Sequence, residues 1–256
     1  MKTISKKIIR KTLIYNTRVE YGDYTMNHVL GCAHGCKYPC YAYLQKKRFG
    51  QISSYEEWCE PALVENTLDI LDSELPKYKN KIQMLHLCFT TDPFMYHYPE
   101  IQKMSVAAIK KVNSYGITCS VLTKGTLLHE LRNLSSRNEY GITIVSLDEQ
   151  FRNQMEPGAA PVIDRISALQ KLHDAGCKTW VSIEPYPTPN IIQQDIMEIL
   201  EKVSFVDKII FGRMNYNKMV TAYKDHKIFY NNMASKVISF CNDRNISYHI
   251  KNKTIS

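Results

Sequence analysis

Apolar residues along the chain recur with two periods, and the two periods alternate. Short apolar runs bounded by Gly, Pro, Asn or Asp are typical of strands. They predict strands at residues 26–30, 82–90, 117–123, 142–147, 178–184, 206–211 and 247–251. Apolar residues three and four positions apart are typical of amphipathic helices. They predict helices at residues 55–75, 99–113, 162–175, 191–203 and 229–242, and a shorter helix that ends at Leu134.

This alternation of strands and helices with short links determines the expected architecture. It predicts an α/β protein whose parallel strands are joined by right-handed crossovers. The predicted units are fewer than the eight of a complete (β/α) barrel, so we expect a single-domain partial barrel of the (β/α)6 type. The sequence contains no internal repeat and no linker. We therefore expect a basic N-terminal segment at residues 1–25 and one core domain at residues 26–256.

The carboxyl ends of the predicted strands become polar. Parallel barrels carry their chemistry at this end, and the two-residue period of a strand assigns its side chains to two faces. We predict that Leu85, Leu87 and Phe89 face the helices. The residues predicted to face the interior are Met84, His86, Cys88 and Thr90, leading to Asp92; Ser120, Leu122 and Lys124; Ile144, Ser146 and Asp148; Trp180, Ser182 and Glu184; and Ile209, Phe211 and Arg213. Because buried polar groups are costly without partners, this ring predicts a site for a polar ligand.

The composition is that of a globular protein, with 44% apolar and 23% charged residues. No apolar run reaches the roughly 18 residues that would predict a membrane span, and the N-terminus lacks the apolar core of a signal peptide. Eight cysteines without a secretion signal favour a reducing compartment, so we expect a cytoplasmic protein. The formal net charge of +8 favours polyanionic partners, but the lysines are scattered along the chain.

The densest group of metal-ligating residues is GCAHGCKYPCYAY, residues 31–43, in which Cys32, Cys36 and Cys40 are four positions apart. Thiolates this close form disulfides, zinc sites or iron–sulfur clusters. A disulfide needs an even number of cysteines, and a zinc site needs a fourth ligand, for which His34 is the nearby candidate. Three thiolates with an open fourth position indicate instead a cubane cluster whose fourth iron takes an exogenous ligand.

The same stretch resembles the cysteine loop of radical S-adenosylmethionine (SAM) enzymes, particularly the branch related to spore photoproduct lyase, in which the pattern Gly-Cys-x-His-Gly-Cys-x-Tyr-Cys-Tyr-Ala recurs. The resemblance continues through FTTDPF, VLTKG, VSLDEQ, MEPGAAPVIDR and VSIEPYPTPN, and more weakly at residues 211–215. The chain departs from the family where Pro39 widens the spacing between the second and third cysteines from two residues to three, giving CxxxCxxxC. The resemblance implies a [4Fe–4S] cluster bound by Cys32, Cys36 and Cys40, with SAM on the fourth iron.

The resemblance also implies residues that bind SAM. Lys124 and Ser146 would hold its carboxylate, for which a lysine serves as a point charge. Further candidates are Thr90, Thr91 and Asp92 near the amino group, Tyr38 or Tyr41 beside the adenine or the cluster, Glu184 and Arg213 from the polar ring, and a Glu156–Arg165 pair that shapes the pocket. The other five cysteines are scattered, and we expect them to be buried as small apolar side chains. Among these, Cys88 is expected to face inward and is our candidate hydrogen-atom donor.

These residues predict a radical SAM enzyme, of the lyase or transferase type, that cleaves SAM reductively to a radical. The radical would act on an unidentified substrate: a small molecule, a peptide or a nucleic acid. A reductant such as ferredoxin or flavodoxin is the expected partner, and no membrane is involved. One alternative is a non-catalytic zinc or Fe–S binding module for nucleic acid or protein, in which His34 joins the three cysteines. Another is a degenerate barrel that keeps the cluster as a redox sensor.

Overall fold

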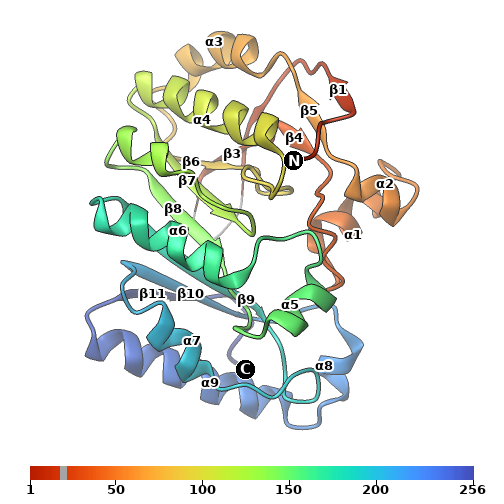
Figure 1. Cartoon of the computed structure of the whole chain (residues 1–256), viewed down its shortest axis with the longest axis vertical. Helices are drawn as coiled ribbons and strands as arrows, with labels where there is room; N and C mark the ends of the chain where they lie inside the picture. The colour runs from red at the N-terminus through yellow and green to blue at the C-terminus, as the bar shows by residue number, and fades with distance from the viewer. Residues whose placement is uncertain (18–21) are drawn as a thin grey trace.

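A curved sheet of eight strands forms the centre of the protein (Figure 1). The computed structural model describes residues 1–17 and 22–256. The strands of this sheet, in spatial order, are β11(Ser247–Ile250), β10(Lys208–Arg213), β9(Lys178–Tyr186), β8(Glu139–Thr143), β7(Thr118–Thr123), β6(Met84–Leu87), β3(Tyr24–Met26) and β2(Ile14–Asn16). Neighbouring strands from β3 to β11 pair in parallel, and β2 pairs antiparallel with β3 at the edge. The predicted partial barrel of parallel strands is therefore confirmed.

A smaller sheet of three strands carries the cysteine loop. Its order is β1(Lys6–Ile8), β5(Ala62–Val64) and β4(Val29–Leu30). Strand β5 is buried throughout because it pairs with β1 on one side and with β4 on the other. The cysteine loop begins directly after β4, so this small sheet positions the first residue of the loop.

The helices fall into two groups. The helices that cross over between strands are α3(Thr67–Tyr78), α4(Pro99–Ser114), α6(Val162–Asp174), α7(Ile196–Lys202) and α9(His226–Asp243), with a 3₁₀ turn η1(His129–Asn133) between β7 and β8. The short helices are α1(Tyr41–Arg48), α2(Tyr55–Cys59), α5(Glu149–Met155) and α8(Lys218–Ala222). Figure 1 shows these short helices together on one side of the molecule, to the right in the view. None of the helices in the described part of the chain is long and apolar enough to cross a membrane.

Several predicted elements differ from those observed. The helix predicted at residues 55–75 is wrong, because the chain forms α2, then β5, and then α3, which continues past Pro76. Ser54 caps α2 by accepting a hydrogen bond from the Glu57 amide, and pairing with β1 and β4 then imposes an extended conformation that helical periodicity does not reveal. The helix predicted to end at Leu134 is a 3₁₀ turn, and α7 begins later than expected, at the Asp195 cap.

The observed register corrects two strand faces, because directly paired residues of parallel strands share a face. Thr143 pairs with Ser182, so Thr143 faces the interior, whereas Ile144, Ser146 and Asp148 follow the end of β8. Their predicted alternation on this strand is therefore wrong.

The prediction for β10 is wrong for a similar reason. Ile210 pairs with Ser182 and faces the barrel interior. Ile209 and Phe211 lie on the other face and pack in the main hydrophobic core. The register shifts between Phe211 and Arg213, and this irregularity returns Arg213 to the site. Strand β6 ends at Leu87, and Cys88 has a φ of 56°, so the alternation predicted for Phe89 does not continue.

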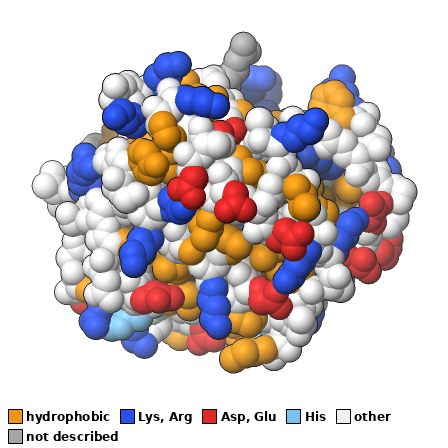
Figure 2. Space-filling view, turned by 90° about the horizontal axis from the view of Figure 1, so that it is seen from above, with side chains coloured by type: hydrophobic (Ala, Val, Ile, Leu, Met, Phe, Trp, Pro, Cys, Tyr) orange, Lys and Arg blue, Asp and Glu red, His pale blue; other side chains and the backbone are white. Residues whose placement is uncertain are grey.

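Charged side chains do not form a patch of one sign on the face shown in Figure 2. Lys and Arg residues there are interspersed with Asp, Glu and apolar side chains. The whole chain has a formal net charge of +8, and its basic residues are not gathered into one patch on this face.

Candidate functional site

A cavity of about 470 Å³ opens at the carboxyl ends of the central strands. The site residues predicted from the sequence line it, except Ser146 and the Glu156–Arg165 pair. They are Cys32, Cys36, Cys40, Tyr38, Tyr41, Cys88, Thr90, Thr91, Asp92, Lys124, Glu184 and Arg213. We call it the cofactor cavity. Residues far apart in the sequence are thus brought together at the end of the barrel where parallel folds place their chemistry.

The cysteine loop is fixed by backbone hydrogen bonds on both sides of the cavity. The Cys32 amide donates to the Trp58 carbonyl at 2.8 Å, and the Tyr55 hydroxyl donates to the Cys36 carbonyl at 2.6 Å. On the opposite side, the Lys37 amide donates to the Met155 carbonyl at 2.8 Å. The loop therefore depends on the segments around α2 and α5, which lie far from it in the sequence.

The three thiols present soft ligands to one cavity from separate points of this loop. No three His, Cys, Asp or Glu side chains in the described residues converge tightly enough to bind a single metal ion. Such convergence is required for tetrahedral zinc. In an iron–sulfur cluster each thiolate binds a different iron, so the ligands lie further apart. Burial raises the pKa of Cys36 to about 12 and raises that of Cys32 as well. The donor set fits a cluster.

Both ring nitrogens of His34 contact other protein groups. Its Nε2 lies 2.8 Å from Asp92 Oδ2, and its Nδ1 lies 3.2 Å from the Gly158 carbonyl oxygen. The Gly158 amide in turn donates to the His34 carbonyl at 2.9 Å. A Cβ at Gly158 would lie 2.1 Å from the Ala33 carbonyl oxygen, so the backbones approach too closely for another residue. His34 therefore anchors the loop, and both of its ring nitrogens are engaged, which removes it as a fourth zinc ligand.

Asp92 connects this loop to the barrel. Its Oδ1 accepts from the Thr123 hydroxyl at 2.6 Å and from the Phe94 amide at 2.8 Å, and its Oδ2 accepts from the Lys124 amide at 2.8 Å. Burial alone would raise the pKa of Asp92, but His34 and these donors hold it below its ordinary value. With four protein partners, the carboxylate is a hub that positions the loop and Lys124.

A buried row of charges lies beside Cys36, and Lys124 is its member that lines the cavity. Lys124 Nζ lies 3.2 Å from Glu156 Oε1 and 3.8 Å from Cys36 Sγ, and Arg165 lies 2.8 Å from Glu156 Oε2. The predicted Glu156–Arg165 pair is thus present. Burial would raise the pKa of Glu156, but the two cations lower it, so the row carries two positive charges and one negative charge. The net positive charge next to the cysteines suits an anionic group such as a carboxylate.

The opposite wall is built from the ends of β9, β10 and β11. Glu184 pairs with Lys251 at 3.2 Å, and the Arg213 Nε donates to Asn215 Oδ1 at 2.8 Å. Sequence reasoning missed several polar residues here: Thr143, Asn215, Tyr216 and Asn252. Strand-end position was the available signal for them. It failed at Thr143 because the strand face was assigned one residue out of register.

Two predicted residues are placed differently from the rest. Ser146 is buried beyond β8, and its hydroxyl accepts a hydrogen bond from the Asp148 amide at 3.1 Å, where α5 begins. Cys88 borders the cofactor cavity, but its Sγ lies 3.5 Å from His28 Nδ1. The roles of Ser146 in SAM binding and of Cys88 as hydrogen-atom donor stay predictions.

The fold and the site together define a partial barrel in which three cysteines and Lys124 line one cavity. The sequence profile of the Radical SAM superfamily matches residues 26–203, more than half of the chain, and the chain belongs to this superfamily. The predicted family is confirmed.

Two relatives are similar in sequence over most of the chain. An uncharacterized protein of Methanocaldococcus jannaschii is 28% identical over 82% of this chain and 77% of its own length. An uncharacterized protein of Acidianus two-tailed virus is 26% identical over 70% of this chain. The matched region spans 61% of the viral relative.

Solved structures show the same fold. Spore photoproduct lyase in complex with dinucleoside spore photoproduct has a TM-score of 0.70 at 15% identity, over 95% of this chain and 80% of the lyase. A mutant of that lyase with bound AdoMet and the same dinucleoside has a TM-score of 0.72 at 14% identity, with the same coverage. Streptococcus suis SuiB with bound S-adenosylmethionine has a TM-score of 0.53 at 13% identity, over 72% of this chain and 43% of SuiB. At these identities the likeness concerns the fold.

Membership in the superfamily implies a [4Fe–4S] cluster and SAM as cofactors, as predicted. Radical SAM enzymes also need an electron donor and a substrate. The residues of the cofactor cavity fit both cofactors, since three thiols suit the cluster and the charged wall suits the carboxylate of SAM.

Proposed function

We propose that this protein is a radical SAM enzyme that cleaves SAM reductively and uses the resulting radical on a separate substrate. Cys32, Cys36 and Cys40 would bind the cluster. The proposal rests above all on the position of these three thiols, which line the same cavity as Lys124, the lysine that Glu156 and Arg165 back from behind. When bound, the cluster and SAM supply one-electron cleavage of the sulfonium to methionine and a 5′-deoxyadenosyl radical.

The protein's own contribution is binding and orientation. Lys124 would attract the SAM carboxylate, while Glu156 fixes the direction of the lysine side chain through their 3.2 Å ion pair. Thr90 and Thr91 line the cavity at the end of β6 and are the proposed partners of the SAM amino group. Asp92, which has four protein partners, would act through the position of the loop.

On the other side, Tyr41 borders the cavity at the start of α1, and Tyr38 is buried beneath Lys124, whose Nζ lies 5.3 Å from its ring centroid. These rings would exclude water from the cluster side. Arg213 and Glu184 would bind the remaining polar groups of SAM from the opposite wall.

The experiment is anaerobic reconstitution with iron and sulfide, followed by dithionite and SAM and by chromatography of the products. We expect 5′-deoxyadenosine from the unmodified protein and none from Cys36→Ala. Cys119→Ala is a matched control, because Cys119 is fully buried on β7 and outside the cavity, so it should keep both the cluster and the product. Methylthioadenosine in place of 5′-deoxyadenosine would keep the cluster and SAM, but it would point to aminocarboxypropyl transfer and contradict the 5′-deoxyadenosyl radical. Zinc in the purified protein, with neither product formed, would contradict the enzyme.

We also propose an electron donor, a compartment and a substrate class for this enzyme. A low-potential protein such as ferredoxin or flavodoxin would donate the electron. All eight cysteines are free thiols, which supports the reducing cytoplasm expected from the sequence. The spore photoproduct lyase structures carry a dinucleoside, and this favours a nucleic-acid substrate among the three classes considered.

A further inference from the structure

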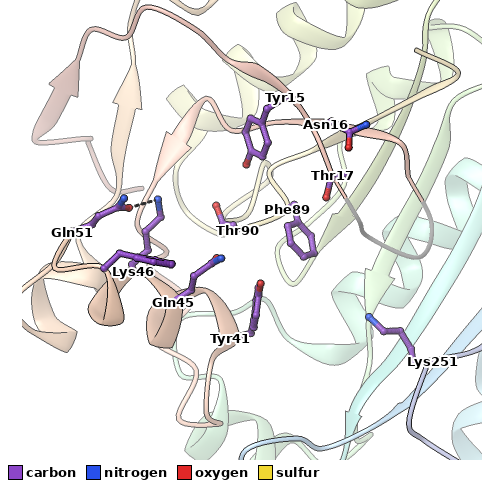
Figure 3. A pocket seen from close by; sticks show the side chains of 11 residues that line it. Tyr15, Asn16, Thr17, Tyr41, Gln45, Lys46, Gln51, Phe89, Thr90 and Lys251 are labelled. Atoms are coloured by element: carbon purple, nitrogen blue, oxygen red, sulfur yellow. Dashed lines mark hydrogen bonds between the residues drawn. The ribbon is translucent and has the colours of Figure 1, made fainter. Parts of the chain in front are cut away.

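A second cavity, of about 530 Å³, adjoins the cofactor cavity (Figure 3). We call it the outer cavity. It lies between β2, α1, the segment after β6 and the segment after β11, and it shares Tyr41, Phe89, Thr90 and Lys251 with the cofactor cavity. Its volume is within the range of small-molecule sites. A ligand in the outer cavity would therefore contact the cofactor cavity through these shared residues.

Aromatic rings form much of its wall. Tyr41 and Phe89 lie with their ring centroids 6.0 Å apart at 50°, and Tyr15 projects from β2. Tyr15 and Tyr41 are 40% and 46% exposed, so large ring surfaces face solvent at the cavity. Bases stack on exposed aromatic rings, and this stacking tolerates any base. This wall suits a flat ligand.

The polar part of the wall is cationic and rich in amides. Figure 3 shows Lys46 and Lys251 on opposite sides, with Gln45 between them. Lys46 donates to Gln51 at 2.7 Å, and Lys251 is paired with Glu184 of the cofactor cavity. Among the described residues that line the outer cavity there is no Asp or Glu.

Among the described residues Lys46 has no ion pair with a carboxylate, and its Nζ donates to the neutral side chain of Gln51. Burial lowers the pKa of Lys46, and repulsion from the positive charge of Arg10 lowers it further. An anion at this point would relieve that repulsion. Exposed rings, side-chain amides and an uncompensated cation are the groups that bind the base, the base edge and the phosphate of a nucleotide. An acidic peptide would use the cation and leave the rings uncovered.

We propose that the outer cavity binds a nucleotide, with its base on the Tyr41–Phe89 side and its phosphate at Lys46, as the recognition site of the enzyme's substrate. This inference rests on the proposed function, because it gives the radical a target. The nucleotide is either free or part of a single strand, and both sources present the same base and phosphate. Residues shared by the two cavities place the sugar and base next to SAM.

The test measures binding to the reconstituted, SAM-loaded protein under anaerobic conditions. The probes are the four deoxynucleoside 5′-monophosphates and a fluorescein-labelled single-stranded hexanucleotide, with inorganic phosphate as a competitor. Lys46→Met should weaken nucleotide binding about tenfold, because a charged phosphate contact is lost. Lys47→Met is the matched control: Lys47 is the next residue of α1, is exposed and does not line the cavity, so binding should be unchanged.

Each outcome has a defined meaning. Binding of mononucleotides as tight as that of the hexanucleotide supports a free nucleotide, and binding of the hexanucleotide alone supports a strand. The inference is overturned if no probe binds while SAM is cleaved normally, if inorganic phosphate competes as well as a nucleotide, or if the two lysine variants bind equally. Absence of SAM cleavage by the unmodified protein is a failure of the proposed function and is read in the separate product assay.

Discussion

The cofactor cavity and the outer cavity share one wall but differ in how their polar groups are compensated. Behind Lys124 of the cofactor cavity, Glu156 is 1% exposed and lies between two cations, and Asp92 in the cavity has four protein partners. In the outer cavity, Tyr15 and Tyr41 are exposed, and Lys46 is bonded to a neutral amide. In the cofactor cavity the charged groups are paired with one another. In the outer cavity the exposed rings and Lys46 are available to a ligand.

This difference indicates what each region does for the fold. Buried ion pairs leave an uncompensated charge when one partner is lost, whereas exposed pairs contribute little. We therefore expect substitutions in the cofactor cavity to affect stability as well as function. Substitutions confined to the outer cavity should affect ligand binding alone.

The largest expected effect is that of Glu156→Ala. Arg165 is 1% exposed, and its NH2 would lose its carboxylate partner while Lys124 lost its own. Breaking a buried pair costs about 3–5 kcal/mol of unfolding free energy, to be measured by urea denaturation. Asp72→Ala is the control, since the Asp72–Lys111 pair is largely exposed and should change stability by less than about 1 kcal/mol. Equal losses in the two variants would show that the charged row is not a structural element.

Most of the cofactor cavity could be predicted from the sequence because its residues lie in local motifs. Cys32, Cys36 and Cys40 are close in the chain, and Lys124 and Asp92 each follow a predicted strand. The barrel was predictable because strands and helices alternate. These are properties of short windows of sequence.

The features that the sequence did not reveal depend on pairing between distant segments. Strand β5 was read as helix because its extended form comes from pairing with β1 and β4. Thr143 was missed because only the register with Ser182 determines its face. The outer cavity joins β2, α1 and the residues after β11, which no local pattern connects. In each case tertiary contact decided the outcome.

A pH dependence of stability is the next largest effect. Burial lowers the pKa of His28 and of His86 to about 4, while the unfolded chain has the ordinary value of about 6.5. Between these values the unfolded state binds protons that the native state does not. Stability is therefore complete above the unfolded pKa and falls as the pH falls towards 4. Each histidine should remove about 2 kcal/mol between pH 7 and pH 5.

The measurement is the urea midpoint as a function of pH for the unmodified protein and for His86→Gln. The variant should lose part of the change of the urea midpoint with pH, because residue 86 no longer titrates. In the unmodified protein His86 Nδ1 lies near the Ser120 hydroxyl, and burial and the charge of Lys208 lower its pKa. His97→Gln, at an exposed position, should keep the slope. An unchanged slope in His86→Gln would mean that this buried histidine does not control acid stability.

The smallest expected effect separates the two cavities most sharply. Lys124→Met leaves Glu156 paired with Arg165, so the fold is retained, but the wall beside Cys36 becomes neutral. SAM should bind about tenfold more weakly, because a charged contact to its carboxylate is lost, while the iron content stays the same. Equilibrium dialysis with labelled SAM measures this loss. Lys46→Met, which alters the outer cavity, should bind SAM normally. If both variants weaken SAM equally, the two cavities act as one electrostatic site, and the separation of cofactor from substrate recognition is wrong.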